Sequence, residues 1–306
     1  MVNISETELK RLEKQDEELR NFKEIAVNLA PSPGDIPEVS GIEVYGISIP
    51  HSGEMGGDHI IYVDFKKRYD LDARISRALK KGQPDIAANL EKCRRRAGIA
   101  LADVSGHQIT DALLALMLHQ AFLLGSVYEL ERSGEITTRL FENINTRFYK
   151  SSSVNKFVTL IYGEISEDGR FRFISAAQPM PVVFSREFDR IVDIHPDLLE
   201  TFPPIGTIPS YEDIDRKTTQ TVLGFKEKYR QNDIDLMGNG DILLLYTDGL
   251  SELSDGMQDY FPGSLENLLR RHKDNSARQI AEALKIDLLA FACPHDDVSF
   301  VVIKKN

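Results

Sequence analysis

Apolar residues follow two different periods along the chain, and each change of period marks the boundary of a predicted element. Alternating apolar and polar residues, or a short apolar run between turn residues, indicate a β-strand, whereas apolar residues three and four positions apart indicate a helix. Strands are predicted at residues 42–49, 59–65, 98–107 (a strand that runs into a glycine turn), 157–165, 171–177, 181–185, 219–225, 241–249 and 297–305. Most are joined by short turns, which favours antiparallel pairing.

Residues 1–33 are predicted to form an N-terminal helix and linker ahead of one domain, residues 34–306. Ser5 and Glu8 have the spacing of a capping box, apolar residues recur at helical steps after them, and prolines at 31 and 33 end the pattern. The apolar stripe is narrow and is interrupted by Asp16. Two readings stay open: a coiled-coil seam that links two copies, or a helix packed on the following domain.

Helical periods predict a long helix at 111–131, a second through 132–149, and two more at 264–271 and 276–291. Strand runs interrupted by helix pairs, without strand-helix-strand alternation, predict an α+β fold in which sheets are covered by helices. Residues 66–97 are a basic tract that Pro84 divides into two short helices. This tract is either a solvated helical hairpin or a flap for docking or regulation.

Charge and composition exclude several classes of protein. The formal net charge is −11, so the chain's own field opposes binding to nucleic acid. Two cysteines are too few for a disulfide framework, and the charged N-terminus lacks the apolar core of a secretion signal. Unbroken apolar runs, such as residues 112–118, fall short of a membrane span. We therefore expect a cytoplasmic protein without a transmembrane segment.

Aspartates follow or precede several predicted strands, each beside a turn residue. A carboxylate at the end of a buried strand is costly unless it caps a helix, pairs with a base or binds a cation. Taken singly, each has a structural explanation as a cap or turn residue. The set comprises Asp58, Asp103, Asp248 and the pair Asp296-Asp297. If these strand ends converge, mutual repulsion raises the carboxyl pKa values or requires a divalent ion.

All-oxygen ligation suits Mg²⁺ or Mn²⁺, whereas zinc would require Cys or His ligands. The seven histidines show no zinc-binding spacing. Two hard cations bridged by carboxylates commonly support in-line attack of water on phosphorus. Hydrolysis of a phosphate ester is therefore the favoured chemistry.

Five ordered motifs resemble the SpoIIE/RsbU-type serine/threonine phosphatases of bacteria, a branch of the metal-dependent PPM protein phosphatase family. The resemblance spans about residues 42–305. The motifs are Gly56-Gly57-Asp58, Ala102-Asp103-Val104-Ser105-Gly106-His107, Phe157-Val158-Thr159-Leu160, Tyr246-Thr247-Asp248-Gly249-Leu250-Ser251-Glu252 and Asp296-Asp297-Val298-Ser299. Each motif alone is weak, but their order over this length is specific.

The resemblance implies a β-sandwich of two antiparallel sheets flanked by helices, with two Mn²⁺ or Mg²⁺ ions at one end. The implied ligands are Asp58, Asp103 with the backbone carbonyl of Val104, Asp248 and Asp296. Asp103 is the implied bridging ligand. A water held between the ions would attack the phosphoserine or phosphothreonine phosphorus directly, without a covalent phosphoenzyme. Asp297 has either a hydrogen-bonding role behind the ligands or a plain role at the start of the strand.

The chain departs from the family pattern at some positions. Gln108 stands where a second glycine is usual, residues 175–179 replace an Asn-Ala-Gly-His-x-Pro motif, and the tract at 66–97 lengthens the link between the first two motifs. His107 is either a proton donor to the leaving group or a structural turn residue.

The leading hypothesis is a phosphatase acting on a phosphorylated partner protein. The resemblance implies a STAS-type anti-sigma-factor antagonist in a partner-switching stress or sporulation circuit. A non-catalytic module that kept the fold is a second hypothesis, suggested by Gln108 and Gln178. A nucleotide cyclase, suggested by Gly-Gly-Asp alone, would leave the other acidic motifs unexplained. As in related proteins, the N-terminal helix is expected to link two copies or to transmit a signal.

Overall fold

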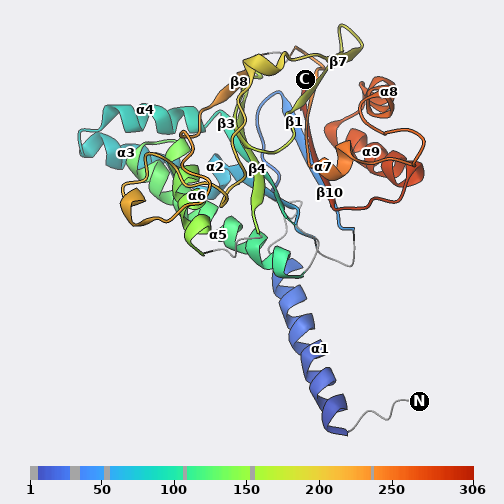
Figure 1. Cartoon of the computed structure of the whole chain (residues 1–306). Coiled ribbons are helices and arrows are strands. Elements are labelled where there is room, and N and C mark those ends of the chain that lie inside the picture. The colour runs from blue at the N-terminus through green and yellow to red at the C-terminus, as the bar shows by residue number, and fades with distance from the viewer. Residues whose placement is uncertain (1–5, 28–34, 52–55, 106–108, 152–155, 236–237) are drawn as a thin grey trace.

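Two β-sheets lie face to face between two layers of helices in the computed structural model of the chain (Figure 1). The structure describes residues 6–27, 35–51, 56–105, 109–151, 156–235 and 238–306. This α-β-β-α sandwich is the predicted fold class, and every pairing between its strands is antiparallel.

Each sheet of the described chain contains five strands. Sheet A has the order β1 (Ile42–Ile49), β10 (Val298–Lys305), β9 (Ile242–Tyr246), β6 (Val182–Ser185) and β7 (Arg190–Val192). Sheet B has the order β2 (His59–Asp64), β3 (Arg96–Val104), β4 (Val158–Ser166), β5 (Phe171–Ala176) and β8 (Asn232–Ile234). The predicted strands β1 and β2 follow each other in sequence but belong to different sheets, so the link between them crosses the sandwich.

Alternation along the strands separates three apolar cores. In β9, Leu243 and Leu245 face the other sheet, whereas Ile242 and Leu244 face the helices that cover sheet A. In β3, Ile99 points between the sheets. The alternate residues of β3, Ala100, Ala102 and Val104, pack under the helices that cover sheet B. Both faces of each sheet are therefore buried, which explains why the central strands are almost continuously apolar.

The helices form one layer on each sheet, and a long helix projects from the sandwich (Figure 1). The layer on sheet B consists of α2 (Phe65–Arg68), α3 (Leu71–Lys80), α4 (Pro84–Cys93), α5 (Ile109–Arg132) and α6 (Thr138–Ser151). The layer on sheet A consists of α7 (Asp248–Ser251), α8 (Gly263–His272) and α9 (Ala277–Phe291). Pro84 begins α4, where its missing N–H costs nothing, and Ser276 with Gln279 forms a capping box at the start of α9.

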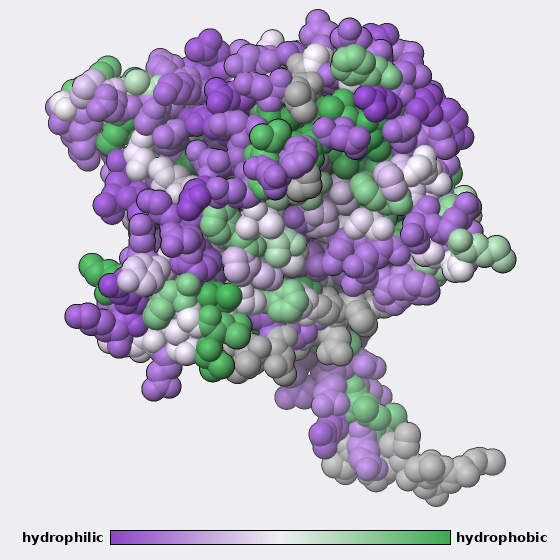
Figure 2. Space-filling view, turned by 45° about the horizontal axis from the view of Figure 1, so that its top comes forward, coloured by the Kyte–Doolittle hydropathy of each residue, from purple (hydrophilic) through white to green (hydrophobic). Residues whose placement is uncertain are grey.

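The projecting helix is α1 (Glu6–Val27), which confirms the predicted N-terminal helix. Its apolar residues Leu9, Leu12 and Leu19 are exposed, and Figure 2 shows apolar side chains among hydrophilic ones on this helix. The capping residue Ser5 lies outside the described residues.

Among the described residues, one stretch, Asp111–Arg132 of α5, is long and apolar enough to cross a bilayer. Unbroken apolar runs, on which the prediction of no transmembrane segment rests, do not reveal this stretch. A mostly buried core helix of a soluble protein passes the same test; in α5 33% of the stretch is buried, and Leu118, Phe122 and Leu130 belong to the core over sheet B. Its length and composition are therefore weak evidence for a membrane span.

One strand prediction is wrong. Residues 219–225 form no strand, and Val222 and Leu223 are 98% and 71% exposed. This segment lies against α6, where the Tyr149 hydroxyl donates to the Gln220 carbonyl.

The short strands β7 and β8 were not predicted, because three residues are too few to show a period. The second long helix was predicted to start at residue 132, but α6 starts at Thr138. Gly134, with φ +73°, interrupts the helical conformation after α5.

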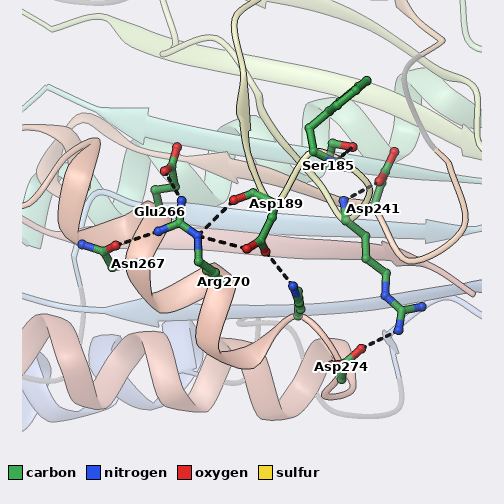
Figure 3. A network of polar contacts seen from close by, with 10 residues as sticks. Ser185, Asp189, Asp241, Glu266, Asn267, Arg270 and Asp274 are labelled. Atoms are coloured by element: carbon green, nitrogen blue, oxygen red, sulfur yellow. Dashed lines mark hydrogen bonds and ion pairs between the residues drawn. The ribbon is translucent and has the colours of Figure 1, made fainter.

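The edge of sheet A is held to α8 by a polar network (Figure 3). Arg270 donates to the Asp189 carbonyl at 3.0 Å, and Lys273 pairs with the Asp189 carboxylate at 2.6 Å. Glu266 accepts from the backbone N–H of Ile191 in β7 and from Arg270. This short edge strand is thereby covered by a helix, which protects it from pairing with another chain.

Candidate active site

The strand pairings bring the predicted acidic residues to one end of the sandwich. In sheet B, the register of β2 and β3 places Asp58, just before β2, opposite Asp103 near the end of β3. In sheet A, β9 ends two residues before Asp248 and its antiparallel partner β10 begins two residues after Asp296. Aspartates far apart in sequence therefore gather where the two sheets end.

A hydrogen bond joins the two sheets inside this cluster. The hydroxyl of Thr247, in sheet A's strand-to-helix turn, donates to Asp58 Oδ2 at 2.9 Å. The same hydroxyl oxygen accepts from the backbone N–H of Ser299 at 2.9 Å. Asp58 is 8% exposed, and no hydrogen-bond partner reaches its Oδ1 atom in the described part of the chain. Thr247 belongs to a motif quoted above, but its role could not be read from sequence.

Burial and mutual repulsion raise the carboxyl pKa values in the cluster. The pKa of Asp58 lies well above its ordinary value, because the side chain is buried and the charge of Asp103 lies nearby. Burial, together with the charges of Asp248 and Asp296, raises the pKa of Asp103 to about 7. The pKa of Asp248 is raised by burial and by Glu252 and Asp296. No cation is among the main influences on these three groups, so the cluster carries uncompensated negative charge when ionised.

Two adjacent aspartates have different surroundings. Asp297 is 2% exposed, and its two oxygens accept the backbone N–H groups of His51 at 2.7 Å and Gly57 at 2.6 Å. Asp296 is exposed and accepts the N–H of Asp297 at 2.8 Å. Asp297 therefore fixes the backbone just before Asp58. The charge of Asp296 instead raises the pKa values of Asp103 and Asp248.

Two glycines allow these segments to approach closely. A Cβ atom on Gly56 would lie 2.1 Å from Asp297 Oδ2, and one on Gly249 would lie 2.1 Å from the Asp297 backbone oxygen. Neither contact is sterically possible. The glycines beside Asp58 and Asp248 are thus required by packing against Asp297.

The donor set fits a divalent cation. Its ligands would be carboxylate oxygens, and the negative charge of these groups is not offset by a nearby cation among the side chains that the structure describes. Asp58 Oδ1 is buried without a hydrogen bond in the described chain. Among the described residues, no three His, Cys, Asp or Glu side chains are arranged around one point as ligands. The pKa shifts nevertheless show carboxylates close enough to repel one another. The carboxylates therefore lie near one another but do not yet point at a common centre. Rotation about their side-chain torsions would be needed for them to coordinate one ion.

Gln178 connects the two sheets at the same end. Its side chain accepts a hydrogen bond from the Thr159 hydroxyl and donates to the Tyr246 carbonyl at 3.2 Å. This residue replaces the histidine of the family motif, and its amide supplies both a donor and an acceptor. Ala177 stands at the motif's usual glycine and adopts φ +59°, a conformation that is strained for alanine.

Two contacts hold helix α5 beside the cluster, and neither was predicted. Nε2 of His59, the residue after Asp58, lies 2.6 Å from Nδ1 of His119 on α5. Burial and the neighbouring His119 lower the pKa of His59 to about 3, so the pair is uncharged at neutral pH. Lys156 pairs with the fully buried Asp111 of α5 and donates to the Ser105 carbonyl at 2.9 Å. No sequence motif relates these residues, because the contacts depend on how α5 packs.

The structure thus brings together four of the acidic residues named from sequence and places Val104 beside them, at the end of β3. The Val104 N–H donates to the Gly57 carbonyl at 3.3 Å. His107 and Gln108 lie outside the described residues, so the two readings of His107 stay open.

Two antiparallel sheets between helical layers, with aspartates gathered where both sheets end, define a PPM-type phosphatase fold. The chain belongs to the stage II sporulation protein E (SpoIIE) family, which matches residues 94–306. The phosphoserine phosphatase RsbU of Bacillus subtilis is 21% identical over 296 residues, covering 95% of this chain and 72% of RsbU. The phosphoserine phosphatase RsbP of the same organism is 26% identical over 212 residues, covering 68% of this chain and 45% of RsbP.

Solved structures support the fold. The SiaA-PP2C domain of Pseudomonas aeruginosa superposes with a TM-score of 0.62 at 14% identity, covering 97% of this chain and 99% of that domain. The PP2C domain of Bacillus subtilis SpoIIE with a fragment of its regulatory domain gives 0.59 at 16% identity, covering 87% of this chain and 64% of that one. These likenesses confirm the predicted sandwich.

Proposed function

We propose that this chain is a divalent-metal-dependent phosphatase that hydrolyses phosphoserine or phosphothreonine on a partner protein. The observation that carries the proposal is that Asp58, Asp103, Asp248 and Asp296 gather at one end of the sandwich from four strand ends, with one buried carboxylate oxygen lacking a partner in the described chain. Membership of the SpoIIE family and likeness to two phosphoserine phosphatases support it.

Asp58, Asp103, the Val104 carbonyl, Asp248 and Asp296 would hold two Mg²⁺ or Mn²⁺ ions. When bound, such ions neutralise charge on the phosphoryl group and activate a water for attack at phosphorus. The chain's own residues prepare the site by orienting the ligands. The Thr247 hydroxyl fixes one oxygen of Asp58 and leaves the other free of hydrogen bonds from the described residues.

The substrate we propose is a phosphorylated STAS-type protein in the cytoplasm. The support is the likeness to RsbU and RsbP, whose names specify phosphoserine. The net charge of −11 makes a nucleic acid an unsuitable substrate.

Phosphate release from p-nitrophenyl phosphate and from a phosphoserine-bearing STAS protein tests the proposal. We expect hydrolysis of both with Mn²⁺ or Mg²⁺ and its loss in excess chelator, because the acidic cluster repels a phosphate anion when no cation offsets its charge. Turnover that persists in chelator would refute metal dependence. Binding of the STAS protein without turnover under any cation would instead support the non-catalytic alternative.

Stabilisation by divalent cations is expected to increase with pH. The raised pKa of Asp103, about 7, means that the folded chain holds this proton more tightly than the unfolded chain. In chelator, stability should therefore fall as pH rises from about 4 to about 7. A cation at 100 times its Kd adds about 3 kcal/mol, and because protons compete for the carboxylates this gain should be smaller at about pH 5 than at about pH 8. Thermal unfolding with and without Mg²⁺ measures the gain, and a gain independent of pH would contradict the expectation.

We further propose that α1 joins two copies of the chain. Leu9, Leu12 and Leu19 recur at steps of three and seven on its exposed face, and a narrow apolar seam on a projecting helix suits a two-stranded coiled coil. Light scattering should then give a dimer, and Leu12→Glu should shift it to monomer. Lys14→Glu, which alters a side chain that is 78% exposed, is the matched control. A wild-type monomer would rule the proposal out.

A further inference from the structure

The helices between β2 and β3 carry a charge opposite to that of the whole protein. Residues 65–97 contain eleven Lys and Arg against four Asp and Glu, whereas the chain has a net charge of −11. These residues form α2, α3 and α4 at one side of the layer over sheet B (Figure 1). Such a local reversal of sign attracts anions.

A cavity of about 280 Å³ lies between α3, α4 and the last turns of α5. Its lining includes the accessible apolar side chains of Ala73 and Ile86, together with the buried Leu90 and Leu130. The volume is just under the roughly 300 Å³ at which ordinary small-molecule pockets begin. The cavity therefore suits a compact ligand with an apolar part.

Cations line the same cavity in excess of the carboxylates. Arg68 and Arg74 line it, and neither forms an ion pair with a carboxylate in the described part of the chain. Arg77 and Lys81 share the single carboxylate of Glu131, at 3.7 and 4.0 Å. Long, exposed pairs of this kind are weak, so these two cations remain able to bind another anion.

A buried donor lies at the same place. Tyr69 lines the cavity and is 9% exposed, and its hydroxyl has no hydrogen-bond partner in the described chain. The Arg74 guanidinium lies over the Tyr69 ring, 5.2 Å from its centroid. Asp70, the nearby acid, is occupied as the cap of α3, where it accepts from the Ala73 N–H at 2.9 Å. A buried hydroxyl without a partner is costly, and a ligand oxygen would satisfy it.

We propose that this cavity binds a small organic phosphate, with its anionic head on Arg68, Arg74, Arg77 and Lys81 and a compact apolar body on Ala73 and Ile86. The site is distinct from the acidic cluster. Leu130 and Glu131 are in the last turn of α5, whereas the first residue of α5 follows six residues after Asp103. The intervening helix of 24 residues is roughly 36 Å long.

Calorimetric titration of the full chain with phenylphosphonate tests the proposal, because this probe carries a phosphate-like head and a ring but cannot be hydrolysed as an ester. The titration is run in chelator and repeated with Mg²⁺. We expect saturable binding that is tighter than that of inorganic phosphate, which lacks the apolar body, and tighter than that of benzoate, which carries one charge. If benzoate bound as tightly as phenylphosphonate, the proposed preference for a phosphate head group would be wrong.

Matched variants separate this cavity from general attraction. Arg74→Gln should weaken phenylphosphonate binding by about tenfold or more, because a charged hydrogen bond is lost. Lys80→Gln removes the same charge from the same helix at a residue that does not line the cavity, and should leave binding unchanged. Tyr69→Phe, which keeps the ring, reports on the hydroxyl alone and should weaken binding less than Arg74→Gln does.

Binding by Asp103→Asn, which alters the acidic cluster, should equal that of the wild type. Loss of binding in that variant would place the probe at the acidic cluster and overturn the proposal. Equal weakening by Arg74→Gln and Lys80→Gln would overturn it too, as would the absence of saturable binding by a wild type that unfolds cooperatively. None of these results depends on whether the chain is a phosphatase.

Discussion

Asp103→Asn is expected to lower phosphatase turnover by about 100-fold or more while leaving the chain folded. Asp103 is the residue whose pKa is affected by Asp248, Asp296 and Asp297 together, so it lies centrally among the carboxylates. A neutral amide in its place removes one negative charge and one ligand, and losses of this size follow when charge stabilisation at a reacting centre is removed. Phosphate release under saturating Mn²⁺ measures the effect.

The fold should survive because the carboxylate at this position is unfavourable without a cation. A raised carboxyl pKa means that the folded state disfavours the ionised form, so removing it should not lower the melting temperature in chelator at about pH 8. Asp197→Asn, at a side chain that is 89% exposed, is the control and should retain full activity. Near-normal turnover in Asp103→Asn would mean that the acidic cluster is not the catalytic centre.

Asp297→Ala is expected to destabilise the chain by about 2–3 kcal/mol and also to reduce activity. The substitution removes the acceptor of two short backbone hydrogen bonds, from His51 and Gly57. Gly57 directly precedes Asp58, so the position of that carboxylate is lost too. Urea unfolding measures the stability, and the Mn²⁺ concentration for half-maximal activity should rise about 10–100-fold.

Asp296→Ala is the matched comparison, one residue away. Because Asp296 is exposed and adds to the repulsion on Asp103 and Asp248, its removal should reduce activity with little loss of stability. The two variants should therefore differ in the stability measurement. If Asp297→Ala were as stable as wild type, the two hydrogen bonds would not be what fixes the approach to Asp58.

The basic cavity at α3 and α4 raises a separate question, because residues 66–97 were interpreted from sequence as either a solvated hairpin or a flap. The structure shows helices there, with α3 beginning at the Asp70 cap and α4 at Pro84. Their charge was visible in the sequence. The cavity was not, because it forms only where these helices meet the end of α5.

Short apolar runs and alternation of apolar and polar residues were sufficient to predict the long strands and an α+β class with helices covering the sheets, whereas the two-sheet sandwich was implied by the family resemblance. In β9 and β10 nearly every residue is buried, so the local pattern alone marks them as central strands. The same reasoning failed at 219–225, where Val222 is almost fully exposed. An apolar run predicts burial only if the rest of the chain provides a surface to cover it.

The sequence by itself determined which carboxylates stand at strand ends, because the strand period and the turn residues are local properties that neighbouring positions encode. Only the tertiary structure decided how those carboxylates differ. Asp296 and Asp297 are adjacent and chemically identical, yet one is exposed and the other holds the N–H groups of His51 and Gly57. That difference arises from segments more than 200 positions away packing across the sandwich, and its physical origin is the pairing of buried polar groups, which no local pattern records.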